Sequence, residues 1–456
     1  MQHLRLFFLI TVLLLVSCGR KSTDDKEDMK KVTLVTLDPG HFHAALVQKN
    51  MYESVSHEVY VFAPGGKELN RHLEMIENYN NREENPTSWE EKVYSGEDFF
   101  EEFIIKRPGN VVILSGNNRE KTDYILKCAE SGFNILADKP MVISPDKFPM
   151  LEKAFRAAAE NDVLLYDIMT ERYEITTMLQ RELSQNRGIF GELIQGSPDK
   201  PSITKESVHH FFKYVSGSPL KRPPWYFDTS QQGEGIVDVT THLVDLVQWE
   251  CYPGMVIEKN DIEIIDASRW PTALTAGEFE LVTGLDTFPG YLDEHVSGNI
   301  LNVYANGEIN YRIKDTHAKV RVEWRFRAPE GGGDTHYSIM RGTLANLIVR
   351  QGEEENYKPV LYLELKKNSP DFNHILEKAL VELPWQGIGY EIIESGKYRI
   401  NIPDKYKTGH EAHFGQVTEK YLQYLEKGNI PEWEIPNMIA KYYTTTQALR
   451  KALKDH

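Results

Sequence analysis

The chain is poor in cysteine, with three among 456 residues. Three thiols are too few for a disulfide framework or for a zinc site built from thiolates alone. Cys128 lies within an apolar, helix-like stretch and is expected to be buried by packing. The sequence therefore predicts a fold that depends on its hydrophobic core and not on cross-links.

Positive charge is also scarce. There are 52 lysine and arginine residues against 68 aspartate and glutamate residues, so the formal net charge is −16. Nucleic acids need clustered lysine and arginine for their phosphates, and a nucleic-acid partner is therefore not expected. The acidic surface does not exclude a neutral small-molecule substrate such as a sugar.

The N-terminal apolar run, Leu6 to Val16, is too short to span a bilayer as a stable anchor. A positive residue precedes it, and Ser17 and Cys18 follow it. This pattern resembles the bacterial lipoprotein signal, in which the cysteine is lipidated. The resemblance implies a signal peptide over residues 1–17, a lipid anchor at Cys18 on the cell envelope (periplasmic side or outer-membrane surface) and a polar tether over residues 18–31. A plain secretory peptide is the alternative.

The remaining chain exceeds the ~250–300 residues at which a single core stops growing, so we expect two domains. Over residues 32–166, apolar strand-like runs alternate with helix-like runs. This predicts an α/β, Rossmann-like, doubly wound parallel sheet that is buried on both faces. The predicted strands are 32–37, 57–62, 111–114, 133–137 and 163–166, and the predicted helices are 41–50, 119–131 and 144–161.

Residues 167–456 predict an α+β domain that would serve substrate binding and oligomerisation. Many strand-like runs with turns between them, from about 256 to 400, favour a large, open, mainly antiparallel sheet. Residues 200–233 are rich in proline, serine, glycine and aromatics, which predicts a long functional loop. The predicted helices are 173–183, 235–249, 411–426 and 436–453.

The first strand–turn–helix is the place for a dinucleotide fingerprint, in which glycines let a pyrophosphate approach backbone amides. Here Gly40 is the sole glycine, because Asp38 and His43 stand where the outer glycines would be. Taken alone, this turn is a weak signal. We nevertheless predict a cofactor site from the residues at the strand ends, namely Asp38, Gly40, His41, Phe42, Ser115, Asn118, Asp138 and Lys139.

The second strand lacks the acid that usually binds the ribose hydroxyls of NAD. Residues 63–66 read Ala-Pro-Gly-Gly, and Lys67 follows. Lys67 could meet a 2′-phosphate, so NADP is as plausible as NAD; it could equally be a solvated loop charge.

Asp138-Lys139-Pro140 ends a buried strand, which places a lysine in the crevice at the sheet edge. A semi-buried ammonium can donate to a substrate hydroxyl and ease its deprotonation. A surface turn lysine is the alternative interpretation.

Asp238 and His242 are four residues apart, so a helix would place both on one face. A carboxylate beside an imidazole can orient it and raise its basicity, which suits a proton shuttle. A helix-surface pair is the alternative. No further ligand cluster joins this pair, and no metal site is expected.

Together these elements resemble the glucose–fructose oxidoreductase / inositol dehydrogenase / MocA family. In that family the Rossmann domain ends in Glu-Lys-Pro and the second domain carries Asp-x-x-x-His on a helix. The resemblance implies that Lys139 positions substrate and nicotinamide, that His242 is the general acid/base, and that Asn118 matches a turn asparagine. It also implies an open sheet that often forms a homodimer face. The degraded glycine motif departs from the family and leaves the choice between NAD and NADP open; we expect the dinucleotide to be tightly bound.

Four further residues are candidates for binding substrate. Arg172 and Tyr173 follow the last Rossmann-like strand, and Trp225 and Tyr226 precede the Asp/His helix. Aromatic rings stack on sugar faces, although simple loop packing explains them equally well.

Three functions follow from these observations. The first is an NAD(P)-dependent oxidoreductase that acts on a CH–OH or keto carbon of a sugar, glycoside or cyclitol. The second is a glycoside hydrolase or lyase that uses tightly bound NAD in a transient oxidation–elimination cycle. The third is a non-catalytic, sugar-binding lipoprotein on the same fold.

Overall fold

The computed structural model describes residues 31–215 and 218–454. Cys18 and the predicted signal peptide lie outside the described residues. From Val32 onward the chain forms one compact unit. Within the described part of the chain, no helix has the length and apolar character needed to cross a membrane.

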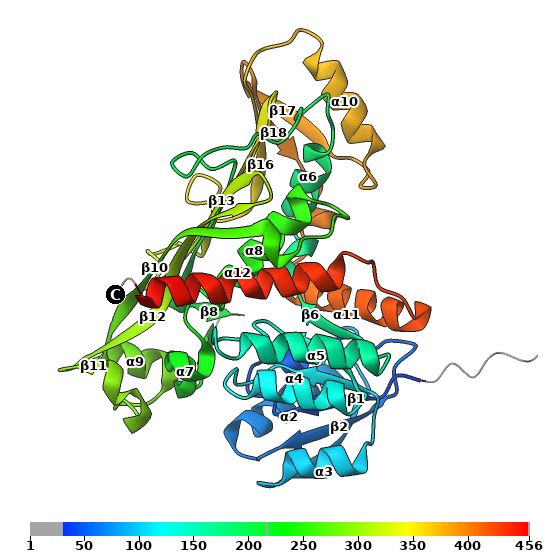
Figure 1. Cartoon of the computed structure of the whole chain (residues 1–456), viewed down its shortest axis with the longest axis vertical. Coiled ribbons are helices and arrows are strands. Elements are labelled where there is room, and N and C mark those ends of the chain that lie inside the picture. The colour runs from blue at the N-terminus through cyan, green and yellow to red at the C-terminus, as the bar shows by residue number, and fades with distance from the viewer. Residues whose placement is uncertain (1–30, 216–217, 455–456) are drawn as a thin grey trace, which may run out of the picture. The chain divides into compact units, whose positions relative to one another are not determined.

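A six-stranded parallel sheet occupies the N-terminal part of this unit (Figure 1). Its order, β3-β2-β1-β4-β5-β6, is that of a doubly wound Rossmann sheet and confirms the predicted fold class. The chain reverses its direction of winding between β1 and β4, the place where such sheets bind ligands. The strands are Leu34–Leu37 (β1), Glu58–Ala63 (β2), Glu90–Ser95 (β3), Val111–Leu114 (β4), Asn134–Asp138 (β5) and Leu165–Ile168 (β6).

Strand β3 and its flanking helices were missed by the sequence prediction. β3 is an edge strand whose side chains are all exposed or half-buried, so it carries no apolar run. The helices of this region are His43–Leu46 (α1), Lys67–Asn81 (α2), Phe99–Lys106 (α3), Lys121–Glu130 (α4) and Phe148–Glu160 (α5).

Helix α1 is much shorter than the predicted helix over residues 41–50. After Leu46 the chain continues in tight turns, in which Gln48 and Lys49 donate to carbonyls only three residues back. The Gln48 carbonyl accepts from the Trp89 indole at 2.6 Å, and its side-chain amide donates to Glu91 at 2.6 Å. These contacts across to the β3 side end the helix.

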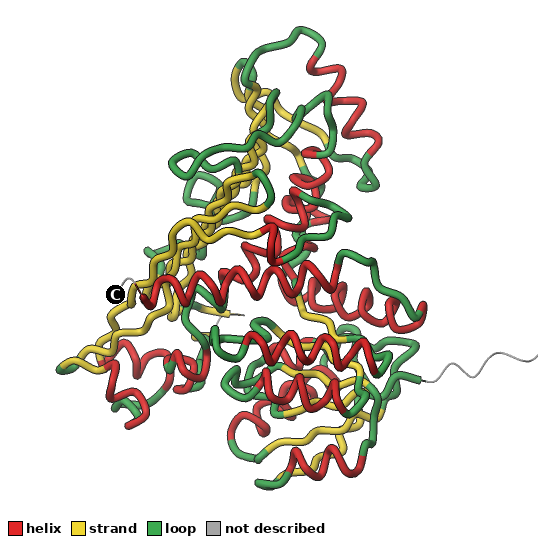
Figure 2. Tube along the Cα trace, viewed as in Figure 1, coloured by secondary structure: helices red, strands yellow, loops and turns green. Residues whose placement is uncertain are grey.

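A large, mostly antiparallel sheet forms the second half and confirms the second part of the predicted fold class (Figure 2). Its order is β10-β12-β13-β7-β14-β15-β16-β18-β17, β11 pairs with β12, and only β7 and β13 run parallel. The strands are Ile203–Phe212 (β7), Ile262–Thr275 (β10), Val296–Ser297 (β11), Ile300–Ile313 (β12), Thr316–Arg327 (β13), Thr335–Arg341 (β14), Ala345–Gln351 (β15), Val360–Leu365 (β16), Gly389–Glu394 (β17) and Lys397–Asn401 (β18). A separate hairpin joins Tyr214–Val215 (β8) to Ser218–Pro219 (β9).

Strand β7 corrects the prediction of a loop over residues 200–233. It lies in the middle of the sheet between β13 and β14, although it contains several polar residues. Its Lys205 is buried, and the ammonium pairs with the Glu250 carboxylate at 2.8 Å. Because the partner lies on a helix 45 residues away, the local sequence hides the strand.

Helices α6 and α8 pack against the large sheet, and α12 packs along α8, β10 and α5. The two closing helices confirm the predicted pair, and their Phe414, Tyr421 and Tyr442 are buried in the core of the six-stranded sheet. The α-helices are Ile175–Ser184 (α6), Thr229–Gln232 (α7), Thr240–Cys251 (α8), Ala276–Thr283 (α9), Phe372–Glu382 (α10), His410–Lys427 (α11) and Glu434–Lys454 (α12). Short 3-10 turns cover Thr170–Tyr173 (η1), Pro224–Phe227 (η2), Lys259–Asp261 (η3), Gly290–His295 (η4) and Asp404–Tyr406 (η5).

Candidate active site

The turns after β1 and β4 pack directly against each other at the carboxyl edge of the parallel sheet. The His41 amide donates to the Ser115 carbonyl at 3.2 Å. A Cβ on Gly116 would lie 2.1 Å from the Asp38 carbonyl oxygen, so only glycine fits there. A Cβ on Gly40 would meet the Asn117 amide and the Trp225 ring, both at 3.3 Å. The glycine-lined space between these turns is therefore filled by the protein itself.

Asp138, the last residue of β5, connects both turns. One of its carboxylate oxygens accepts from the Ser115 hydroxyl at 2.9 Å and lies 2.9 Å from the His43 Nδ1 atom. Its backbone carbonyl accepts from the buried Lys121 ammonium at 3.0 Å. Burial alone would raise the pKa of Asp138, but His43 and Lys121 hold it well below its usual range. Asp138 is therefore an anion under all ordinary conditions.

Lys139 bridges the two halves of the chain. Its ammonium donates to Asp238 at 2.6 Å, and the second oxygen of Asp238 accepts from Gln232 at 3.0 Å. Burial would lower the pKa of Lys139, but the Asp238 and Asp138 carboxylates raise it above its ordinary value. The predicted lysine is therefore a charged, oriented donor and not a surface turn residue, with 11% of its side chain exposed.

His242 lies on the first turn of α8, close enough to Lys139 for the lysine charge to act on the imidazole. Burial and the Lys139 charge lower the pKa of His242 well below its ordinary value, so the imidazole is neutral. Its Nδ1 atom is buried without a hydrogen-bond partner. The predicted pairing of Asp238 with His242 is wrong: Asp238 precedes α8 in a turn and is committed to Lys139 and Gln232.

The charged and imidazole groups of this edge act on one another, through contacts or through their charges. We call them the edge cluster: His41, His43, Asp138, Lys139, Asp238 and His242. His410, at the start of α11, lies beside the cluster, with its ring centroid 5.3 Å from that of His43. Sequence reasoning gave His410 no role, because nothing in the local sequence connects positions 43 and 410.

Asn118 and the aromatic pair hold the rim of the site. The Asn118 side chain donates to the Gln232 carbonyl at 2.7 Å, which ties the β4 turn to α7. Trp225 and Tyr226 are buried in η2, where Trp225 covers Gly40 and Tyr226 lines a small cavity that also touches Asp238. Burial raises the pKa of Tyr226 to about 12, so its hydroxyl keeps its proton.

Arg172 is not placed to bind substrate, contrary to the prediction. Its guanidinium donates to Asp245 through two bonds of 2.7 Å and to Glu434 at 3.0 Å. Tyr173 packs against the core of the parallel sheet. The neighbouring Glu171 interacts electrostatically with Lys139. Burial and the Glu174 charge raise the pKa of Glu171 to about 7, and the Lys139 charge opposes this rise.

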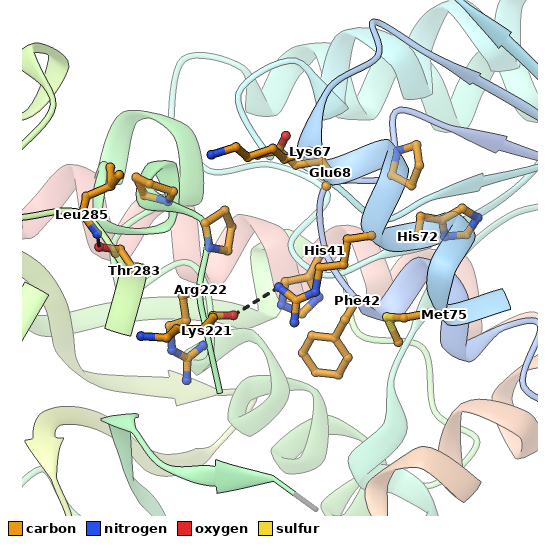
Figure 3. Close-up of a pocket in the computed structure, with 15 residues that line it drawn as sticks. His41, Phe42, Lys67, Glu68, His72, Met75, Lys221, Arg222, Thr283 and Leu285 are labelled. Atoms are coloured by element: carbon orange, nitrogen blue, oxygen red, sulfur yellow. Dashed lines mark hydrogen bonds between the residues drawn. The ribbon is translucent and has the colours of Figure 1, made fainter. Parts of the chain in front are cut away.

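A cleft of about 330 Å³ opens beside the β1 turn (Figure 3). Its walls come from the β1 turn, from the start of α2 and from segments around residues 221–224 and 283–285 of the second half. Four cationic residues, Lys67, Arg71, Lys221 and Arg222, line it against one acid, Glu68. Arg71 donates to the Lys221 carbonyl at 3.1 Å, which connects the two walls.

His72 and Phe42 line the same cleft. Both ring nitrogens of His72 are buried without a partner, and burial lowers its pKa to about 4. A buried imidazole without partners is unusual in a folded protein and suits a position beside a ligand.

The comparisons agree with this architecture. A protein-family profile described as "Putative oxidoreductase C terminal domain" matches residues 179–453. A comparison with curated protein sequences gives no match. The crystal structure of a "putative oxidoreductase" from Parabacteroides merdae is 52% identical, covers 94% of this chain and 98% of its own, and superposes with a TM-score of 0.91.

Two more distant structures share the fold. Levoglucosan dehydrogenase in complex with NADH is 10% identical, with a TM-score of 0.59 over 93% of this chain and 98% of its own. KijD10, a 3-ketoreductase from Actinomadura kijaniata in complex with NADP and TDP-benzene, is 11% identical, with a TM-score of 0.56 over 92% and 98%. The profile match spans more than half of the chain and the Parabacteroides relative spans nearly all of it. The chain therefore belongs to the oxidoreductase family that carries this C-terminal domain.

Proposed function

We propose that this protein is an NAD(P)-dependent oxidoreductase that acts on a CH–OH or keto carbon of a sugar, glycoside or cyclitol. The observation that carries the proposal is a lysine held in place by Asp238 at the carboxyl edge of the Rossmann sheet, with a buried histidine near enough to feel its charge. Such a pair supplies a hydrogen-bond donor and a proton acceptor to one substrate oxygen.

A dinucleotide would fit in the cleft, which the β1 turn lines with Gly40, His41 and Phe42. The contacts of Gly40 and Gly116 leave no free space between the β1 and β4 turns. Asp38 follows β1 directly, and burial and the Glu68 charge raise the pKa of its carboxyl to about 6. The cleft instead offers Lys67, Arg71 and Lys221, whose charges suit phosphates. A nicotinamide bound here would supply hydride transfer to or from the substrate carbon.

The chain's own residues would move the proton. In the oxidation direction, the Lys139 ammonium donates a hydrogen bond to the substrate oxygen and stabilises negative charge that develops there. His242 accepts the hydroxyl proton, and in the reduction direction it returns one. Asp238 keeps Lys139 charged and in place, and it is a positioning residue for that reason.

The substrate class is supported by the neighbours and by the rim of the site. The two distant neighbours are a levoglucosan dehydrogenase and a 3-ketoreductase. Trp225 and Tyr226 place aromatic surface next to the edge cluster, and aromatic faces are common partners of sugar rings.

The direct test has two parts. Purified protein is heat-denatured and the supernatant is assayed for NAD or NADP; the protein is then titrated with each dinucleotide by calorimetry. We expect a retained or bound dinucleotide, and reduction of NAD(P) when sugars and cyclitols are added. Absence of both retained and bound dinucleotide would overturn the proposal in favour of a non-catalytic sugar-binding role. Release of an aryl aglycone without net redox change would move the function to glycoside cleavage.

We also propose export and lipid anchoring through Cys18. The support is the sequence pattern alone, since Cys18 lies outside the described residues. Expression of the full chain and of Cys18→Ala, followed by membrane fractionation and lipid labelling, tests it. Equal soluble fractions for both proteins would contradict the anchor.

A further inference from the structure

Two histidines and an aspartate converge where the glycine fingerprint is missing. His41 and His43 come from the β1 turn and Asp138 from the end of β5, and one ligand atom from each lies within 4.8 Å of the other two. The Asp138 oxygen is 2.9 Å from Nδ1 of His43 and 3.9 Å from Nδ1 of His41. A metal ion with ligand bonds near ~2 Å needs separations of this size between its ligand atoms.

The donor chemistry suits a first-row transition metal. Imidazole nitrogens and a carboxylate bind Zn²⁺, Co²⁺ and Fe²⁺, and two histidines with one carboxylate leave coordination positions open. Nδ1 of His41 is held by one long contact, the His43 backbone amide at 3.4 Å, so its lone pair is largely available. The Ser115 hydroxyl donates to Asp138 at 2.9 Å and orients its carboxylate, and carboxylates that bind metals are commonly hydrogen-bonded in this way.

The location gives the site access from solvent. His43 and Asp138 are buried, while His41 has 20% of its side chain exposed and lines the cleft. The charge of Lys139 is balanced by Asp238, and Lys121 is the remaining nearby ammonium that opposes a cation. Three protein ligands leave a coordination position open, and His41, which lines the cleft, offers the route by which a ligand oxygen would reach it.

We propose that His41, His43 and Asp138 bind one divalent transition-metal ion, with an open position facing the cleft. The ion would be a Lewis acid for an oxygen of the bound substrate, either a hydroxyl or a keto oxygen. This goes beyond the proposed redox function and contradicts the expectation from sequence that no metal is bound. It also gives a reason for histidines in a turn where the fold ordinarily places glycine.

The test is a titration of the chelator-treated protein with Co²⁺, without dinucleotide. Visible absorption of bound Co²⁺ and equilibrium dialysis with metal analysis report the binding independently of activity. We expect one equivalent per chain, displaced by Zn²⁺. His41→Ala and Asp138→Asn should weaken the affinity at least ~100-fold, because loss of an outer partner alone costs 10–100-fold. The control is His374→Gln, which changes an exposed histidine on α10 away from the cleft and should leave the affinity unchanged.

Two results would overturn the site. One is a wild-type protein that binds no Co²⁺ and no Zn²⁺, which would leave His43 and Asp138 as a hydrogen-bonded pair only. The other is binding that survives in both variants. Circular dichroism of each variant shows whether it is folded. We expect His41→Ala to fold, because the His41 side chain is 20% exposed. Because no dinucleotide is present, a negative result here leaves the redox proposal standing, and the reverse also holds.

Discussion

Two buried groups of charges meet along α8, one through His242 and the other through Asp245, and they differ in how completely they are paired. In the first, the edge cluster, His242 Nδ1 has no partner and His41 Nδ1 has one long contact. The second we call the ion network, and in it each cation has at least two acceptors within 3.0 Å. The ion network consists of Asp167, Arg172, Asp245, Glu434 and Lys441.

This difference separates stability from function. The ion network joins β6, η1, α8 and α12, and every bond is made inside the protein. Nothing in it is left to meet a ligand. The edge cluster keeps a charged donor, Lys139, and one unpartnered imidazole nitrogen, Nδ1 of His242, and its His41 lines the cleft. Buried polar groups without partners are costly, and one that lies beside a charged donor at the ligand-binding edge of a Rossmann sheet is a candidate to meet a ligand.

The largest expected effect is loss of turnover in the edge cluster. Lys139→Met and His242→Ala should each lower kcat by about 10³-fold, in the range typical of positioned proton-transfer groups. Steady-state kinetics on folded protein measures this.

The matched control is Lys147→Met. Lys147 also pairs with an aspartate, Asp123 at 2.7 Å, but about a third of its side chain is exposed and it lies outside the cleft. Turnover near the wild-type value in Lys139→Met and His242→Ala would contradict the assigned roles.

The next effect is on stability and should be confined to the ion network. Arg172→Met leaves Asp245 and Glu434 short of a cation in the interior, and we expect a loss of about 3–5 kcal/mol in the free energy of unfolding. Urea denaturation measures it. Arg181→Met, which breaks a half-exposed pair with Glu182, should cost less than about 1 kcal/mol. If Arg172→Met instead raised KM and left stability intact, Arg172 would be a substrate residue after all.

A smaller effect concerns Glu171, which lies between the two groups. Its pKa is raised from 4.5 to about 7 by burial and Glu174, so its ionisation opposes folding. The penalty is absent below about pH 4.5, grows as the pH rises, and is complete above about pH 7. Glu171→Gln should therefore gain about 1–2 kcal/mol over the wild type at pH 8 and nothing at pH 4.5. Thermal unfolding at both values measures this, and an equal difference at the two would refute it.

The smallest effect is on cofactor affinity. Lys67→Ala and Arg71→Ala should each weaken NAD(P) binding by about tenfold, the loss of one charged contact, with the loss shrinking at high salt. Calorimetric titration at two salt concentrations measures it. Lys106→Ala removes an exposed cation outside the cleft and is the control. A larger effect of Lys67→Ala on NADP than on NAD would identify the preferred dinucleotide.

Much of the fold could be predicted from the sequence, and the predictions that failed did so for physical reasons. The apolar runs at β1, β4, β5 and β6 identified the fold correctly, and the Asp138-Lys139-Pro140 turn located a largely buried lysine at the end of β5. β3 was missed because an edge strand needs no apolar face, and β7 because its polar residues are paired with a distant helix. Arg172 was misassigned because adjacency to a strand end does not reveal which way a side chain points.

The sequence alone determined which side chains stand at the ends of the parallel strands, because apolar runs force those strands into the core and leave the turns at one edge. Only the tertiary structure decided which of these side chains meet. Asp238 pairs with Lys139 and not with His242, and His41 and His43 reach Asp138, because the partners come from segments about a hundred residues apart. Packing distances between such segments depend on the whole core, and no local pattern encodes them.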